Sequence, residues 1–174
     1  MTQPHDETTI LRVPPGTWRV DPVHSSVAFE VKHMMIATVR GHFADFDGTP
    51  EAAEDDPRHS RARGSVRVAS IDTGNADRDA HLLAPGFFDA EHYPEMSFES
   101  TRIEPVEGGT YDVWGNLTIR DVTREIRVTG VVQGAAEDPW GDERVGIAVR
   151  GTINRTEFGL TWEQRRASGG MVGD

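Results

Sequence analysis

The stretch from Ser70 to Ser100 decides the fold, and it reads SIDTGNADRDAHLLAPGFFDAEHYPEMSFES. Apolar residues alternate with polar ones on both sides of its centre: Val66, Val68, Met96 and Phe98. A period of two is typical of half-buried strands. Between them, residues 75–84 have the pattern of a short helix, with Thr73 or Asn75 as the N-cap and Pro85 at its end. We therefore expect strand, short helix, strand.

The same alternation runs through most of the chain. It predicts strands at 18–20, 27–33, 39–48, 64–71, 95–103, 111–119, 122–133 and 145–153. Neighbouring segments are joined at hairpin spacing, and Gly41 is expected to mark a bulge or bend. An antiparallel sheet of about eight strands can close into a barrel with room for one small ligand. We predict an all-β, antiparallel barrel with one short helix near residues 75–84; a β-sandwich is the alternative.

Composition limits the classes of partner. The 174 residues fit one domain, and 36% hydrophobic with 27% charged residues is typical of soluble globular proteins. With 29 Asp and Glu against 18 Lys and Arg, the net charge is -11. Such a surface repels phosphate backbones and anionic lipids, so nucleic acid and peripheral membrane binding are not expected. The absence of Cys excludes disulfides, Cys-ligated zinc and a thiol nucleophile.

The ends of the chain predict its organisation. Residues 1–15 are polar and lack the pattern of a signal peptide. No run approaches the roughly 20 apolar residues of a membrane span. We expect a flexible N-terminal arm at 1–15, a ligand-binding barrel at 16–174, no stable membrane insertion and a cytoplasmic location.

An enzyme is the rival interpretation. His residues and many carboxylates share residues 21–92, which is compatible with a metal-dependent or hydrolytic enzyme. However, no His-Glu-x-x-His spacing and no nucleophile elbow occur. His24 and Ser25 are adjacent and would point to opposite faces of a strand, so they make a poor base and nucleophile. We therefore assign no catalytic residue, no metal ligand and no required cofactor, and we expect no enzyme.

Residues spread over the barrel region carry a resemblance to a known family. They are Trp18, Asp21, His24-Ser25, Phe29, His33, Gly41, Phe43, Phe46, Asp72-Thr73, Arg78-Asp79, His81-Leu82, Phe87-Phe88-Asp89, Tyr93-Pro94, Phe98, Ser100, Gly115, Leu117-Thr118-Ile119, Val122-Thr123, Arg155 and Phe158-Gly159-Leu160. In this order they resemble the YceI-like family, the lipocalin-like barrels described as polyisoprenoid-binding proteins. The resemblance covers about residue 16 to the end. It implies a barrel around a long apolar tunnel that holds an isoprenoid, a quinone or a similar amphiphile, without catalytic residues.

Two departures from the family pattern carry expectations of their own. Asp121 stands where the family usually has Gly in a hairpin, and because Asp tolerates left-handed or Asx-turn geometry better than most residues, we expect only a local adjustment there. Family members usually continue past the equivalent of residues 172–174 into a final strand. We expect that strand to be missing here, either because the sequence is truncated or because the barrel closes in a different way. A strand edge left exposed by its absence could pair with a second copy and form a homodimer.

The expected site follows from the resemblance and from the apolar alternation. Its apolar tunnel residues are Phe29, Val31, Phe43, Phe88, Phe98, Trp114, Leu117 and Trp162. Its polar residues near the mouth, candidates for a head group, are His33, Arg78 and His81. The alternatives are a filled core, an Arg78 that only pairs with Asp residues to fix the helix, and an interaction module with exposed Trp140 and Trp162. The expected function is to bind and sequester or carry a polyisoprenoid or quinone-like lipid.

Overall fold

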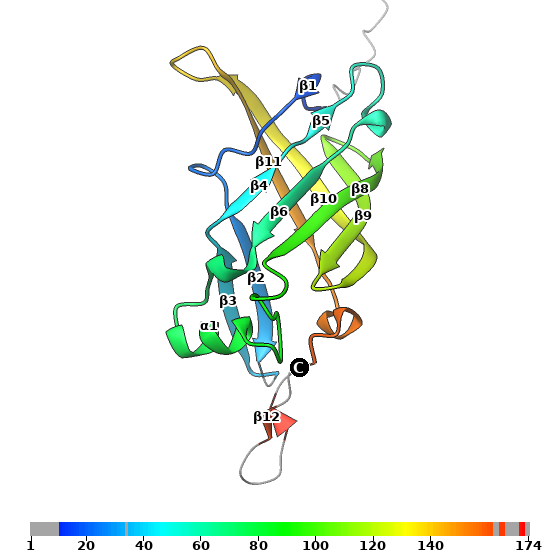
Figure 1. Ribbon diagram of the computed structural model, residues 1–174. Helices are drawn as coiled ribbons and strands as arrows, with labels where there is room; N and C mark the ends of the chain where they lie inside the picture. Colours follow the sequence, from blue (N-terminus) through cyan, green and yellow to red (C-terminus); the bar gives the residue numbers. More distant parts are fainter. Residues whose placement is uncertain (1–10, 34, 162–163, 166–170, 173–174) are drawn as a thin grey trace, which may run out of the picture.

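The computed structural model describes residues 11–33, 35–161, 164–165 and 171–172 (Figure 1). Its strands are β1 (Gly16–Thr17), β2 (Val27–His33), β3 (Ala37–Phe43), β4 (Phe46–Gly48), β5 (Glu51–Ala52), β6 (Arg63–Arg67), β7 (Ile71–Asp72), β8 (Glu95–Pro105), β9 (Thr110–Ile119), β10 (Val122–Glu137), β11 (Glu143–Gly151), β12 (Gln164–Arg165) and β13 (Met171–Val172). Its helices are η1 (Pro57–His59), η2 (Val68–Ser70), α1 (Ala76–Leu83) and η3 (Arg155–Phe158). The prediction of an all-β fold with one short α-helix is confirmed.

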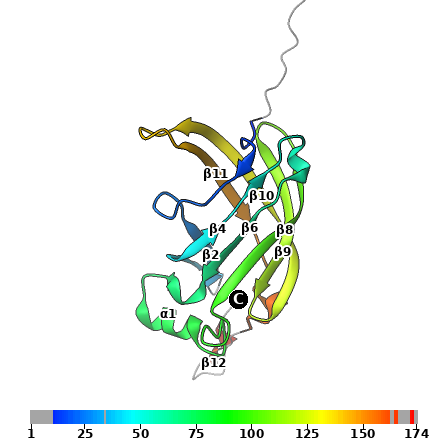
Figure 2. The same cartoon turned by 45° about the horizontal axis from the view of Figure 1, so that its top comes forward.

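The strands form one strongly curled antiparallel arrangement. Six of them pair in the order β11-β10-β9-β8-β6-β4, and three more pair in the order β2-β3-β7. Figures 1 and 2 show the sheet wrapping around an axis, as a half-barrel with α1 and η3 at its lower end. The curl gives the sheet a concave inner face and a convex outer face.

A shared corner joins the two sheets. β3 continues into β4 after Ala44 and Asp45, and β6 continues through η2 into β7, so both strands bend at the same level. The bend is held by hydrogen bonds from the Ala44 amide to the Ser70 carbonyl (3.1 Å) and from the Asp45 amide to the Ser70 hydroxyl (3.0 Å). Val68, in η2, is 1% exposed and packs at the corner. Backbone polar groups freed by the bend are thus satisfied locally.

Helix α1 begins and ends where its sequence predicts. The Asn75 side chain accepts a hydrogen bond from the Arg78 amide (2.9 Å), which caps the first turn. Asp77 and Asp79 lie in that turn and complement the positive end of the helix dipole. The helix ends at the extended Ala84, directly before Pro85. The short excursion between the two strands therefore closes one side of the lower end.

Residues 11–13, in the segment predicted as an N-terminal arm, contact the rest of the chain. The Leu11 carbonyl accepts a hydrogen bond from the Tyr111 hydroxyl (3.1 Å), and Arg12 donates to the Glu54 carbonyl (2.7 Å). Val13 packs against a core cluster. Residues 11–13 therefore contact the sheet, and residues 1–10 lie outside the described part of the chain.

One local expectation is wrong, and the turn beside Asp121 has an unexpected geometry. Gly41 marks no bulge or bend, because β2 and β3 keep an unbroken register from Val27 to His33. In the β9–β10 hairpin, the residue with left-handed backbone is Arg120 (φ 57°), not Asp121. A side chain with a long stem at positive φ is uncommon, so this turn is held by contacts of Arg120 with its surroundings.

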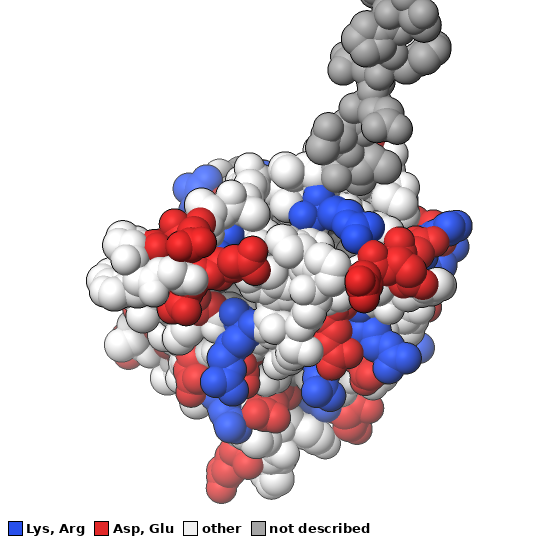
Figure 3. All heavy atoms as spheres, turned by 90° about the horizontal axis from the view of Figure 1, so that it is seen from above, with Lys and Arg blue, Asp and Glu red and all other residues white. Residues whose placement is uncertain are grey.

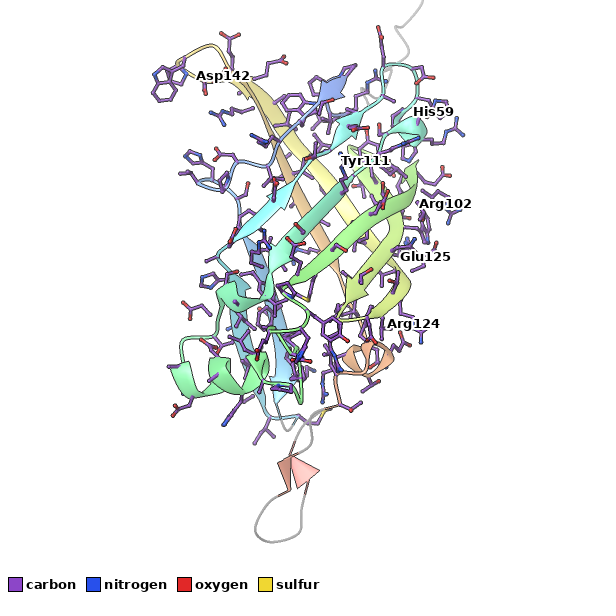
Figure 4. The ribbon with its side chains drawn as sticks, viewed as in Figure 1. His59, Arg102, Tyr111, Arg124, Glu125 and Asp142 are labelled. Carbon is purple, nitrogen blue, oxygen red and sulfur yellow. The ribbon has the colours of Figure 1, made fainter. Side chains whose placement is uncertain are left out.

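Most of the buried apolar residues form two separate clusters, and Phe43, Val68 and Ile71 are buried outside them. The lower core contains Phe87, Ile119, Phe158 and Leu160, which come from the α1–β8 loop, β9 and the η3 segment. The upper core contains Ile103, Tyr111 and Val132, and Figure 4 places Tyr111 in the upper half of the sheet. The two clusters share no member. The sheet is therefore packed at both ends, with a different environment between them.

The first and last parts of the curled sheet meet at one point. The amides of Trp18 and Val20 bond to the Pro50 and Gly48 carbonyls, so the segment beside β1 forms one margin of the curl. Arg144, in β11 at the other margin, lies 3.1 Å from Asp21. A hollow of about 390 Å³ lies there, lined by residues 15–19 and 142–144.

The Asp21 carboxylate is well suited to this bridging position. Its hydrogen bond with His24 lowers its pKa most, and the Val23 amide and the Arg144 charge act in the same direction. Asp21 therefore stays ionised at neutral pH. We call the Asp21–Arg144 pair the clasp.

We expect Arg144→Gln to loosen this closure without unfolding the sheet. Amide hydrogen exchange in residues 16–20 and 143–147 should accelerate about two- to fivefold, the range for an exposed ion pair. Arg150→Gln, an exposed change on the same strand, is the control. Unchanged exchange in the Arg144 variant would show that the clasp does not hold the two margins together.

Candidate ligand-binding site

The inner wall of the curl is apolar. In the register of β8 and β9, Phe98 lies opposite Leu117 and Ile103 lies opposite Val113. On β10, Ile126 pairs with Gly115 and Val128 with Val113, so they share this face. Because alternate residues of a strand face opposite sides, these positions all face the interior. We call this surface the inner wall.

Glycines keep the inner wall flat. A Cβ on Gly115 would overlap with the ring of Phe98, and a Cβ on Gly41 would overlap with the ring of Phe29. A Cβ on Gly151 would likewise overlap with the side chain of Val128. The side chains of Phe29, Phe98 and Val128 can therefore pack against the backbone of a neighbouring strand instead of projecting into the interior. This arrangement reduces the volume that side chains occupy in the interior.

The inner wall is incompletely covered. Phe98 and Val128 are only half buried. On β11, Ile147 is 42% exposed and Val149 is 60% exposed, although both pair with inward-facing positions of β10. A contiguous apolar surface that is left partly exposed is typical of a site for a ligand or a partner.

Most predicted tunnel residues lie on the inner face. Phe29 contacts Phe43 with ring centroids 5.5 Å apart, and Phe43 contacts Phe88 at 6.5 Å. Phe43 is 6% exposed, and Phe88 packs on the lower core, as does Leu117. Val31, on the same face of β2 as Phe29, is 39% exposed. Trp162 lies outside the described residues, and ligand contact by any of these residues stays a prediction.

The placement of Trp114 in the tunnel is wrong. Trp114 lies three positions from Leu117 in an unbroken part of β9, so the two side chains face opposite sides. The guanidinium of Arg102 lies 3.6 Å from the centroid of the Trp114 ring, and that of Arg127 lies 5.5 Å away. Arg127 also pairs with Asp112 (2.6 Å). Trp114 is thus part of a cation–π stack on the outer face.

The polar candidates have structural partners. Arg78 donates from Nε to the Thr73 hydroxyl and from Nη2 to the Thr73 carbonyl, both at 2.7 Å. Asp79 in turn accepts bonds from the Thr73 amide and hydroxyl. Arg78 therefore ties α1 to β7, by way of Thr73 and not through an ion pair with Asp. His81 is exposed on α1, and the His33 side chain lies outside the described part of the structure.

The described residues do not support the enzyme alternative. Three His residues pair with a nearby carboxylate at the surface: His24 with Asp21, His59 with Asp55 and His92 with Asp89. Within the described ranges, no three His, Asp or Glu side chains are close enough to hold a metal ion. None of the helices described here is long and apolar enough to cross a membrane.

The inward glycines are the site residues that our sequence reasoning missed. Gly48, Gly64 and Gly130 occupy positions on the inner wall, as does Gly115. The sequence did contain a signal for them, because these glycines occupy positions at which the alternating pattern of a strand predicts an apolar side chain.

Comparison with known proteins identifies relatives over most of the chain. Residues 18–174 match the model of the YceI-like domain. The UPF0312 protein ECA1782 of Pectobacterium atrosepticum is 34% identical over 83% of this chain and 75% of its own length. Protein YceI of Salmonella newport is 33% identical over the same shares.

Solved structures show the same fold. The YceI protein of Campylobacter jejuni superposes with a TM-score of 0.67 at 30% identity, over 81% of this chain and 82% of its own. BcnA of Burkholderia cenocepacia gives 0.67 at 27% identity, over 81% and 84%. A polyisoprenoid binding domain from Saccharophagus degradans gives 0.51 at 14% identity, over 78% and 76%, which supports the fold alone.

We expect Gly115→Ala to destabilise the fold. The added methyl overlaps with the Phe98 ring and the Glu99 carbonyl, and overpacking of this kind costs about 1–3 kcal/mol. Thermal unfolding measures the loss, and Gly134→Ala, where a Cβ meets nothing within 4 Å, is the matched control. Equal stability of the two variants would show that the Phe98 ring does not need the glycine.

Arg78→Ala should lower the free energy of unfolding by about 1–3 kcal/mol, because the buried Thr73 loses two donors. Chemical denaturation measures this change.

We also expect a folded Arg78→Ala variant to lose affinity for anionic and neutral amphiphiles to the same extent. A selective loss for the anionic ligand would restore Arg78 as a head-group residue.

Proposed function

The chain belongs to the YceI-like family, and we propose that it binds and carries a long apolar amphiphile, such as a polyisoprenoid or a quinone-like lipid, along its inner wall. The observation that carries the proposal is the incompletely covered apolar inner wall. Glycines under Phe29 and Phe98 hold the rings flat, which favours an extended ligand beside them over a solid core.

The energetics suit such a ligand. Burial of apolar surface is worth about 25 cal/mol per Å², so each five-carbon unit contributes on the order of 2 to 3 kcal/mol before ordering costs. Several units suffice for tight binding without a single polar contact. The structural neighbour from Saccharophagus degradans is itself described as a polyisoprenoid binding domain, which agrees with this ligand class.

Sequestration requires no chemistry from the protein. The described His residues that pair with carboxylates are exposed, and each partner is close in sequence. Such pairs stabilise local turns and assemble no reaction centre. We therefore propose a binding protein and not an enzyme.

The test is mass spectrometry of an organic extract of the purified protein, with two matched variants. Phe98→Glu places a charge on the inner wall, and Trp114→Glu places the same charge on the outer face. We expect a stoichiometric lipid in the wild type and in Trp114→Glu, and none in a folded Phe98→Glu. A wild type that carries no lipid and refuses added prenyl lipids would overturn the proposed function.

A further inference from the structure

The β2–β3 hairpin ends in an exposed apolar turn. Ile36 is 85% exposed and Met35 is 69% exposed. In the part of the chain that the structure describes, no other two consecutive large apolar side chains are exposed in this way. Figure 1 shows the hairpin reaching the lower end of the half-barrel. We call Met35 and Ile36 the apolar tip.

The backbone of the apolar tip is unfavourable for the residue that occupies it. Met35 has a left-handed backbone (φ 61°). Hairpin turns usually place Gly or Asn at positive φ, because a larger side chain is strained there. A polar or small residue would therefore suit this turn better in water. A bulky apolar side chain kept against both preferences indicates an apolar partner outside the chain.

The charge of the hairpin differs from that of the rest of the protein. Although the chain contains 29 Asp and Glu residues, none of them lies in residues 31–44. Arg40 is already paired with Glu30 (2.7 Å), so the exposed Lys32 supplies the positive charge beside the apolar tip. A lipid bilayer offers phosphate groups to Lys and an apolar layer beneath them. The hairpin therefore matches a bilayer surface in both charge and polarity.

The upper end of the molecule does not match a bilayer. Trp140, in the β10–β11 loop, is 84% exposed, but Asp138, Asp142 and Glu143 surround it in the sequence. Figure 4 places Asp142 in this loop, and Figure 3 shows acidic side chains on both sides of the upper end. The phosphates of a bilayer repel such a surface. An exposed aromatic residue is thus available at the opposite end as a matched comparison.

Apolar side chains lead from the apolar tip to the interior. Val31, which is 39% exposed, pairs with Val39 near the end of the hairpin. Phe29 follows Val31 on the same face of β2 and contacts Phe43, which is 6% exposed. A lipid that leaves a bilayer at the hairpin would therefore meet apolar surface along this path instead of water.

We propose that the apolar tip inserts into the surface of a lipid bilayer, and that the protein takes up and releases its amphiphile at this contact. The inference rests on the proposed function and adds the partner with which the amphiphile is exchanged. The net charge of -11 keeps the rest of the surface away from an anionic bilayer, so the contact is small and reversible. Insertion of one large apolar side chain shifts such a binding equilibrium about tenfold or more.

Co-sedimentation with vesicles tests the contact, using phosphatidylcholine with about one fifth phosphatidylglycerol to provide negative charge. We expect the wild type to bind, and Ile36→Asp to lower the partition coefficient at least about tenfold. Trp140→Asp, the same change at an equally exposed site of the upper end, should bind like the wild type. Lys32→Gln should weaken binding about fivefold on these vesicles and leave binding to pure phosphatidylcholine unchanged.

A wild type that does not bind these vesicles overturns the bilayer contact, as does equal binding by the wild type and Ile36→Asp. Loading with geranylgeraniol then tests the exchange. Ile36→Asp should load about tenfold more slowly from vesicles, yet reach the same occupancy as the wild type when the alcohol is added from ethanol. Equal loading rates from vesicles overturn the exchange. A wild type that binds vesicles but accepts geranylgeraniol from neither source overturns the proposed function and leaves the bilayer contact standing.

Discussion

The shared bend of β3–β4 and β6–β7 is the constraint on which the rest of the structure depends. Two neighbouring strands of a sheet can turn sharply only if their freed amides and carbonyls find partners, and the Ser70 carbonyl and hydroxyl supply them. Val68 anchors the corner by near-complete burial. Without this corner, β2 and β3 would extend the larger sheet, and Phe29 would not face the same interior as Phe98.

Glycines shape the resulting interior as much as the large aromatic residues do. Gly41 and Gly115 allow Phe29 and Phe98 to lie against the sheet, so the wall is apolar without being filled. The outer face uses its aromatic residue differently. There, Trp114 is held between two arginines, which gives a convex surface with no need of a partner.

The sequence predicted the fold well because strand period, hairpin spacing and the capped helix are local signals. It also held the signal that excludes Trp114 from the interior, since positions 114 and 117 differ by an odd number in one strand. Other features depend on distant parts of the chain. The pairing of Asp21 with Arg144, and the convergence of Arg120 and Arg155 on one turn, bring together residues that no local period relates. The left-handed Arg120 likewise depends on its surroundings.

The division of the buried residues into two clusters sets how an elongated ligand would be selected. The packed ends around Phe158 and Val132 fix the length of the space between them, because close-packed interiors resist deformation. The inner wall outside the clusters is different, since Phe98 and Val128 are only half buried and belong to neither cluster. If the proposed ligand binds there, the packed clusters select for its chain length, and the less tightly packed wall tolerates differences in its width, including branches and double bonds.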